Sequence, residues 1–129
     1  MKRLLGSAVL VLALTVTASA TAHALSGLKG TYAAKITGAP SPQLNGTWAL
    51  KFSGSGYTIL LNGHAVISGS LSYEQGSILF TDKSGPLACK PKGSYRYILG
   101  GKTLRFTVYT DTCPGRKFVL VGHKFTKTA

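Results

Sequence analysis

The chain has 129 residues, and its 15 lysines and arginines against three aspartates and glutamates give a formal net charge of +12 at pH 7. This length suits one ordinary domain, and three carboxylates leave little material for general acid–base catalysis. The excess of positive charge indicates weak attraction to anionic polymers or cell surfaces and says nothing about the fold.

The first 24 residues have the parts of a secretory signal peptide. Lys2-Arg3 is the charged start, an apolar run follows it, and Ala22-His23-Ala24 is a small-x-small cleavage signal. The apolar run is too short for a transmembrane helix. We therefore expect residues 1–24 to be removed and residues 25–129 to form one secreted or periplasmic domain without a transmembrane segment.

Five segments in the first half of this domain alternate apolar and polar residues, which is the period-two pattern of half-buried strands. They are Gly30–Thr37, Leu44–Phe52, Tyr57–Leu61, His64–Tyr73 and Ser77–Thr81. Turn residues separate them. Pro40 and Pro42 cannot donate to a ladder, and Asn62-Gly63 is typical of a two-residue hairpin turn.

A hairpin is predicted after a loop rich in Gly, Pro and Lys. Six apolar residues would share its inner face: Tyr95, Tyr97, Leu99, Leu104, Phe106 and Val108. We expect Gly100-Gly101 to form the turn, because glycine adopts positive φ freely. Leu99 would then face Lys102. Cys89 and Cys113 would meet beyond the open end, and in an oxidising compartment we expect them to form a disulfide.

The last predicted strand runs from Arg116 to about Phe125, after a loop at Asp111–Gly115. No segment of the domain shows a convincing helical period. Eight sequential strands with short connections predict an all-β fold, an eight-stranded antiparallel up-and-down barrel, whose closure removes exposed edges. The alternative is a two-sheet sandwich, which needs longer crossing connections.

The predicted loops differ between the two ends of this barrel. The long, basic and disulfide-bearing loops would lie at one end, so we place the mouth of a cup there, near Lys90 and Arg116. The predicted interior carries almost no ionisable group. Eight aromatic residues are the candidate lining of a ligand site: Trp48, Phe52, Tyr57, Tyr73, Phe80, Tyr95, Tyr97 and Phe106.

The content of the interior stays open at this point. A barrel of eight strands either fills with side chains or holds one small ligand. Gly46 and Gly69 at inward positions leave room for a ligand, and the inward tyrosines would offer hydroxyl groups to orient it.

Catalysis, metal binding and cofactors are not expected. Glu74, Asp82 and Asp111 lie at turns or strand ends, where carboxylates usually cap turns. A pair of Asp82 and Asp111 at one rim is a minor alternative. His64 and His123 do not have metal-ligand spacing, and no motif for a nucleophile or a phosphate loop is present.

Specific nucleic-acid binding is also not expected. Arg96 and Arg105 would face outward on neighbouring strands. The aromatic residues beside them would point inward, so no stacking platform is predicted.

The sequence resembles a known family between about Gly46 and Phe125. Gly46-Thr47-Trp48 resembles the glycine-x-tryptophan signature of lipocalins and related calycin barrels. A second set of residues is similar to uncharacterised secreted bacterial lipocalin-like proteins: Phe80-Thr81-Asp82, Gly85-Pro86, Cys89, Gly93, Tyr95-Arg96, Leu104, Asp111, Cys113 and Arg116. The resemblance implies an eight-stranded barrel that binds a small hydrophobic molecule without catalysis.

One feature departs from the lipocalin pattern. In lipocalins the tryptophan lies on the first strand, and a basic residue of the last strand packs over it. Here Trp48 falls on the second predicted strand, and Lys124 or Lys127 would supply the basic residue.

Two functions follow as expectations. The first is a secreted, non-enzymatic, lipocalin-like protein that binds a small hydrophobic ligand inside the barrel. The alternative is an exported protein-binding module with a filled core, such as a protease inhibitor or a surface-interaction protein. Exported bacterial inhibitors of metalloproteases share the barrel and the single disulfide, but they use an ordered N-terminal segment, and Leu25–Lys29 is too short and glycine-broken to suggest one.

Overall fold

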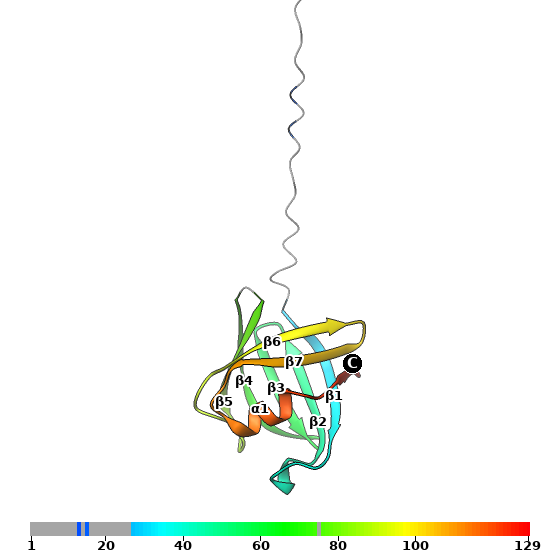
Figure 1. The fold of residues 1–129 in the computed structure, drawn as a ribbon, viewed down its shortest axis with the longest axis vertical. Coiled ribbons are helices and arrows are strands. Elements are labelled where there is room, and N and C mark those ends of the chain that lie inside the picture. The colour runs from blue at the N-terminus through cyan, green and yellow to red at the C-terminus, as the bar shows by residue number, and fades with distance from the viewer. Residues whose placement is uncertain (1–12, 14, 16–26, 75) are drawn as a thin grey trace, which may run out of the picture.

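The computed structural model of the chain describes residues 13, 15, 27–74 and 76–129. Apart from positions 13 and 15, the predicted signal peptide lies outside the described residues. Residues 27–74 and 76–129 form a closed barrel in which each strand pairs antiparallel with its sequence neighbours (Figure 1). Its strands are β1 (Lys29–Ile36), β2 (Gly46–Ser53), β3 (Gly56–Leu61), β4 (His64–Glu74), β5 (Ser77–Ser84), β6 (Gly93–Gly100), β7 (Thr103–Thr110) and β8 (Phe125–Lys127).

The predicted barrel is therefore confirmed, and its closure depends on the shortest strand. β8 pairs with β1 through Tyr32 and Ala33 and with β7 through Thr103 and Leu104. In the described part of the chain, no helix is long and apolar enough to cross a membrane.

The prediction of a strand from Arg116 to Phe125 is wrong. Pro114–Leu120 is the helix α1, and β8 begins only at Phe125. Pro114 suits the first turn of a helix, where its missing N–H costs nothing. Arg116, Val119 and Leu120 are buried, at the spacing of one helical face. Seven residues make only two turns, which is too short for that period to stand out in the sequence.

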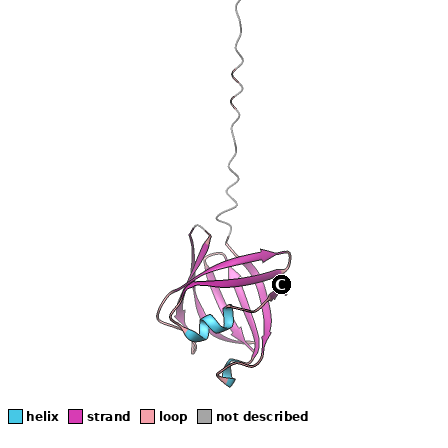
Figure 2. Ribbon diagram, in the orientation of Figure 1, coloured by secondary structure: helices cyan, strands magenta, loops and turns pink. Residues whose placement is uncertain are grey.

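Two short helical segments lie toward the end of the barrel opposite the β6–β7 turn, as Figure 2 shows. One is α1, and the other is the 3₁₀ helix η2 (Pro42–Leu44) in the loop between β1 and β2. We call this end the capped end. It also carries the loop between β5 and β6 and the disulfide between Cys89 and Cys113, which confirms the predicted pairing.

In the β6–β7 hairpin, the β6 residues near the turn pair with β7 residues two positions later than predicted. Leu99 pairs with Leu104, not with Lys102, and Gly100 pairs with Thr103. The turn residues are therefore Gly101 and Lys102, and Gly101 has the positive φ of 60° that the turn requires. The side chain of Thr103 stabilises this turn by donating to the Gly100 carbonyl oxygen at 2.8 Å.

Aromatic side chains fill the centre of the barrel. Phe80 makes edge-on contacts with the rings of Tyr57, Tyr95 and Phe106, with centroids 5.2, 5.5 and 5.9 Å apart. Such contacts stabilise a core beyond the burial of their area. The predicted inward positions Leu99 and Val108 are wrong, because both side chains are exposed.

Candidate functional site

A buried group of charges lies at the capped end. Arg116 of α1 donates to both oxygens of Asp111, from Nε at 2.7 Å and from Nη2 at 2.8 Å. Its Nη1 lies 3.2 Å from Asp82 Oδ2, where it forms an ion pair without the angle of a hydrogen bond. All three side chains are almost fully buried. Sequence reasoning placed Arg116 at an open mouth, and this is wrong.

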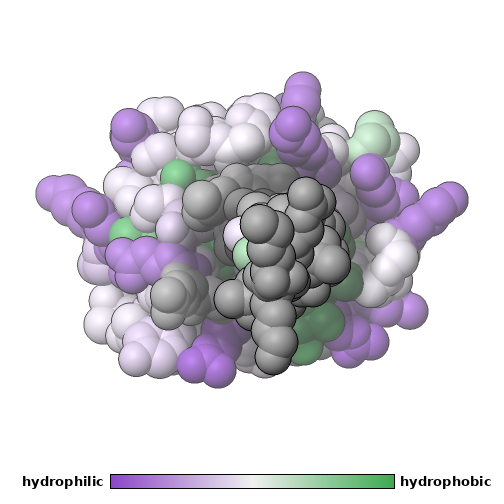
Figure 3. Space-filling view, turned by 90° about the horizontal axis from the view of Figure 1, so that it is seen from above, coloured by the Kyte–Doolittle hydropathy of each residue, from purple (hydrophilic) through white to green (hydrophobic). Residues whose placement is uncertain are grey.

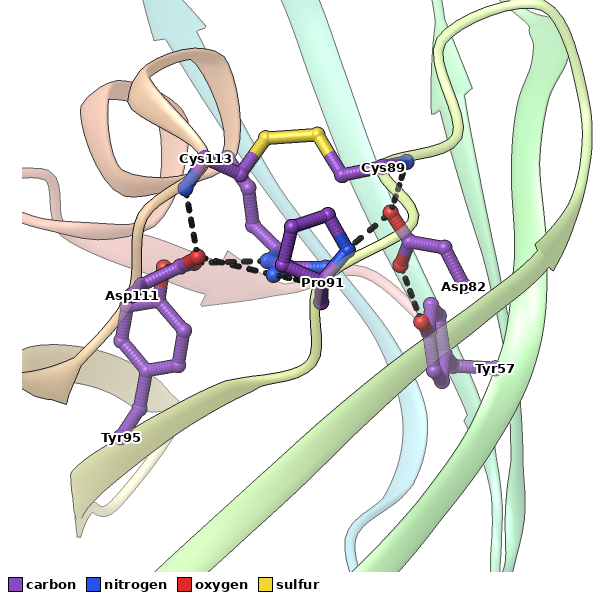
Figure 4. A network of polar contacts seen from close by, with 8 residues as sticks. Tyr57, Asp82, Cys89, Pro91, Tyr95, Asp111 and Cys113 are labelled. Carbon is purple, nitrogen blue, oxygen red and sulfur yellow. Dashed lines mark hydrogen bonds and ion pairs between the residues drawn. A yellow bond between two sulfur atoms is a disulfide. The ribbon is translucent and has the colours of Figure 1, made fainter.

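Two tyrosines of the barrel wall complete the carboxylate contacts. Tyr57 of β3 donates its hydroxyl proton to Asp82, and Tyr95 of β6 donates to Asp111 (Figure 4). Asp82 reaches the interior because it continues the inward alternation of Ile78 and Phe80 in β5. Following that alternation one step beyond Thr81 would have placed Asp82 inside from the sequence alone.

The same carboxylates hold the loops that carry the disulfide. The backbone N–H of Cys89 donates to Asp82, and that of Cys113 donates to Asp111, both at 2.8 Å. Arg116 also donates to the carbonyl oxygen of Pro91 at 2.6 Å. The network therefore ties α1 and two loops to the barrel wall, as Figure 4 shows around the disulfide.

The environment of the network fixes its protonation state. Burial raises the pKa of Tyr57 and of Tyr95, and the carboxylates Asp82 and Asp111 raise them further. Burial alone would raise the pKa of Asp111, but hydrogen bonds, first from Arg116, outweigh it and hold that pKa below its ordinary value. Burial would lower the pKa of Arg116, yet its contacts with Asp111 and Asp82 raise it. At neutral pH, both tyrosines keep their protons while Asp111 and Arg116 stay charged.

Glycines make room for the polar network rather than for a ligand. A Cβ at Gly93 would lie 2.4 Å from Asp111 Oδ2, and one at Gly69 would lie 2.6 Å from the Tyr57 hydroxyl. A Cβ at Gly46 would likewise meet the side chain of Asn62 at 2.6 Å. The space that the sequence left open at Gly46 and Gly69 is thus occupied by the chain itself.

An apolar cavity of about 100 Å³ remains beside the network. Its wall comes from α1, η2, the β5–β6 loop and three strands: Leu44, Trp48, Ile59, Ile67, Leu87, Cys89, Gly115, Arg116, Val119 and Leu120. Drug-sized ligands occupy roughly 300–1,000 Å³. This cavity has room for only a few non-hydrogen atoms.

Most of the candidate lining residues are packed in the core. Six of the eight are buried, namely Trp48, Phe52, Tyr57, Phe80, Tyr95 and Phe106. Tyr73 and Tyr97 are half-buried toward the other end. There the Tyr73 hydroxyl accepts from the Leu28 N–H at 2.9 Å and donates to Gly54 O at 3.2 Å. The hydroxyl groups of Tyr57, Tyr73 and Tyr95 therefore already have protein partners.

The β6–β7 hairpin contrasts with this packed interior. Among the described residues, the large apolar side chains that are exposed all lie on it: Ile98 (66% exposed), Leu99 (50%), Val108 (40%) and Tyr109 (68%). The Arg96 guanidinium lies over the Tyr109 ring, 5.8 Å from its centroid. Tyr95 and Phe106, which were predicted to point inward beside Arg96 and Arg105, are buried, whereas Tyr109 is exposed.

The charged side chains on the molecular surface are almost all basic. Asp82 and Asp111 are buried with Arg116, so Glu74 is the remaining side-chain carboxylate of the chain. After residue 24, the other 12 lysines and arginines, Lys90 of the predicted mouth included, are all exposed. Seen from the end that carries the β6–β7 turn, hydrophilic side chains surround the molecule, with apolar patches between them (Figure 3).

Comparison with models of protein families, with curated proteins and with solved structures finds no match to this chain.

The structure places Trp48 on the second strand, as the sequence predicted, but it does not place Lys124 or Lys127 over it. Trp48 lies on β2 and donates its indole N–H to Leu44 O at 2.8 Å. Lys124 and Lys127 are exposed, and Arg116 of α1 is instead the basic residue that lines the cavity with Trp48. In the described part of the chain, no three His, Cys, Asp or Glu side chains gather as metal ligands would.

Proposed function

We propose that this is an exported, non-enzymatic binding protein that recognises another protein through the β6–β7 hairpin. The observation that carries the proposal is the gathering of exposed Ile98, Leu99, Val108 and Tyr109 on one hairpin. Exposed apolar surface that is concentrated on one element is a mark of interaction surfaces. The signal-like N-terminus and the disulfide support export, because disulfides persist in oxidising compartments.

The polar network supports a structural rather than a catalytic interior. Both tyrosine hydroxyls and both carboxylates of the network have partners within the chain. A general base needs a lone pair that faces a substrate, and these carboxylates face Arg116, tyrosines and backbone N–H groups. The network stabilises the barrel that presents the hairpin.

A lipocalin-like function is the second candidate, and the cavity beside Trp48 supports it. An apolar cavity of this kind takes up small apolar molecules when they fit. A ligand of a few non-hydrogen atoms would contact Trp48, Val119 and Leu120. A lipid-sized ligand would require α1 to move away from the barrel.

Affinity capture with matched variants tests the proposal. The exported protein is immobilised and exposed to culture supernatant of its host. We expect a partner protein to be retained by the native chain and by Leu60→Ser, which removes an outward apolar side chain of β3. The double variant Ile98→Ser/Tyr109→Ser should lose that partner.

Two results would contradict the proposal. Equal capture by both variants would show that the hairpin is not the binding surface. Recovery of a bound small molecule in native mass spectra, with Trp48 emission that shifts on adding it back, would favour the second candidate.

A further inference from the structure

The pairing between β5 and β6 stops early. It consists of Ile78 with Tyr95, Leu79 with Ser94 and Phe80 with Gly93. β6 then continues as far as Gly100, paired only with β7 in the described part of the barrel. The edge of Arg96–Gly100 that faces away from β7 therefore has no strand beside it among the described residues. We call it the free β6 edge.

A groove of about 480 Å³ lies where the two strands separate. It is lined by Glu74 and Ser77 of the β4–β5 hairpin and by Ser94, Arg96 and Tyr109 of the β6–β7 hairpin. An extended chain that pairs with the free β6 edge would pass through this groove. The groove is polar, as expected for a place that admits the backbone of another strand.

Side chains alternate along the free β6 edge. Arg96 and Ile98 point outward with Arg105 of β7 beside Ile98, while Tyr97 and Leu99 point to the other face. An added strand would place its own side chains alternately next to these two rows. Cross-strand neighbours of opposite charge or of apolar character stabilise such pairs. The matching segment has an acidic residue beside Arg96 and apolar residues beside Ile98 and Leu99.

The charge of the molecule selects the occupant. With Asp82 and Asp111 buried against Arg116, the surface formed by residues 27–74 and 76–129 has 12 exposed cationic side chains and one acidic side chain, Glu74. A second copy would bring two such surfaces together, and like charges across an interface are unfavourable. An acidic partner gains from the same field. Unpaired backbone groups and exposed Ile98 favour a polypeptide over nucleic acid or lipid.

We propose that the free β6 edge binds an extended acidic segment of a partner protein by β-strand addition. This rests on the proposed function, since it names the part of the hairpin that binds and the chemistry of its partner. Backbone hydrogen bonds supply the attraction common to such sites, and Arg96, Ile98 and Leu99 supply selectivity.

A synthetic probe tests this mode directly. The probe is a capped peptide of about nine residues in which Glu alternates with Val and Thr, titrated into the isotope-labelled exported protein. We expect hydrogen exchange of those Arg96–Gly100 amides that point away from β7 to slow about tenfold at about 1 mM peptide, while β2 and β3 amides stay unchanged. A peptide with Lys in place of Glu should not slow them.

Two controls separate strand addition from charge attraction. Arg96→Glu should weaken probe binding about tenfold, whereas Lys51→Glu, the same charge change on the outward face of β2, should weaken it less than about twofold. N-methylation of alternate probe residues on the pairing edge should abolish binding, because it removes the backbone donors. Equal weakening by the two variants, or binding that survives N-methylation, would overturn strand addition.

Other outcomes decide between this inference and the proposed function. Tighter binding of oligothymidylate or of phosphatidylglycerol vesicles than of the probe would overturn the choice of a protein partner. Capture of a natural partner that depends on Ile98 and Tyr109 but leaves the Arg96–Gly100 amides in free exchange would contradict strand addition alone. Protection of those amides by the probe, together with capture that is insensitive to Ile98 and Tyr109, would contradict the proposed function alone.

Discussion

The two ends of β6 differ in nearly every respect. At Gly93 the strand packs against a carboxylate whose charge is matched by Arg116 and whose oxygens accept from Tyr95 and Cys113. At Gly100 the same strand ends in a turn whose neighbours are exposed on both faces. The charged network and the disulfide lie at the capped end, whereas the hairpin end contributes to closure only where Thr103 and Leu104 pair with β8. A surface that binds a partner can then carry apolar residues and an unpaired edge without loosening the barrel.

Removing the central charge of the network should break this contrast most strongly. Arg116→Met leaves Asp82 and Asp111 buried without their cation, so we expect a loss of about 3–5 kcal/mol in the free energy of unfolding. Urea denaturation measures it. Arg96→Met on the exposed hairpin is the matched control and should change stability by less than about 0.5 kcal/mol. Similar losses for both variants would refute the division between the two ends.

The disulfide contributes to the capped end through the unfolded state. Its cysteines are 24 residues apart, and a loop of that length supports a loss of about 3 kcal/mol when Cys89 and Cys113 are both replaced by Ser. The denaturant midpoint measures the loss. An unchanged midpoint would show that the network alone holds the two loops.

The two glycines at the ends of β6 offer the sharpest comparison. In Gly93→Ala the new Cβ would lie 2.4 Å from Asp111 Oδ2, whereas in Gly100→Ala the nearest atom would be 3.6 Å away, an ordinary contact. We expect Gly93→Ala to cost about 2 kcal/mol and Gly100→Ala less than about 0.5 kcal/mol. Thermal unfolding compares them, and equal effects would mean that the network tolerates displacement.

The free energy of unfolding should also depend on pH through the groups of the network. The raised pKa of Tyr95 stabilises the fold fully below about pH 10, and that contribution is lost as the pH rises further, because the unfolded tyrosine loses its proton first. The lowered pKa of Asp111 stabilises the fold above about pH 4, and this stabilisation is lost as the pH falls further.

The variant Tyr95→Phe separates this contribution from the rest. It should cost about 1.5 kcal/mol at neutral pH and lose stability less steeply above about pH 10 than the native chain does. Denaturant midpoints across the pH range measure both effects. Tyr109→Phe on the exposed hairpin is the matched substitution and should cost less than about 0.5 kcal/mol at neutral pH. If Tyr95→Phe lost stability above about pH 10 as steeply as the native chain, this hydroxyl would not contribute to the loss.

The sequence predicted the barrel well because its evidence is local. Alternation along each strand shows which residues point inward, and Asn62-Gly63 fixes a turn by its own chemistry. The disulfide followed from the hairpin, since the two cysteines flank it. Helix α1 escaped prediction because a burial pattern at Arg116, Val119 and Leu120 is also compatible with a short irregular strand.

The network and the hairpin surface could not be predicted in the same way. Arg116 and Asp82 form their ion pair although they lie 34 positions apart in the sequence, and such a separation leaves no periodic signal. Whether a barrel is filled depends on how side-chain volumes add up in three dimensions, which alternation does not reveal. Leu99 and Val108 are exposed where β6 and β7 have no second neighbouring strand, because β5 pairs with β6 only up to Tyr95 and β8 pairs with β7 only at Thr103 and Leu104. Such strand lengths are beyond the reach of local patterns.

Residue-resolved hydrogen exchange, with and without the partner captured from the supernatant, tests the central claim most directly. The account predicts slower exchange along Arg96–Gly100 on binding and no change around Trp48 and α1. Unchanged exchange in β6, with new protection around Trp48 and α1, would contradict it and return the binding site to the cavity at the capped end.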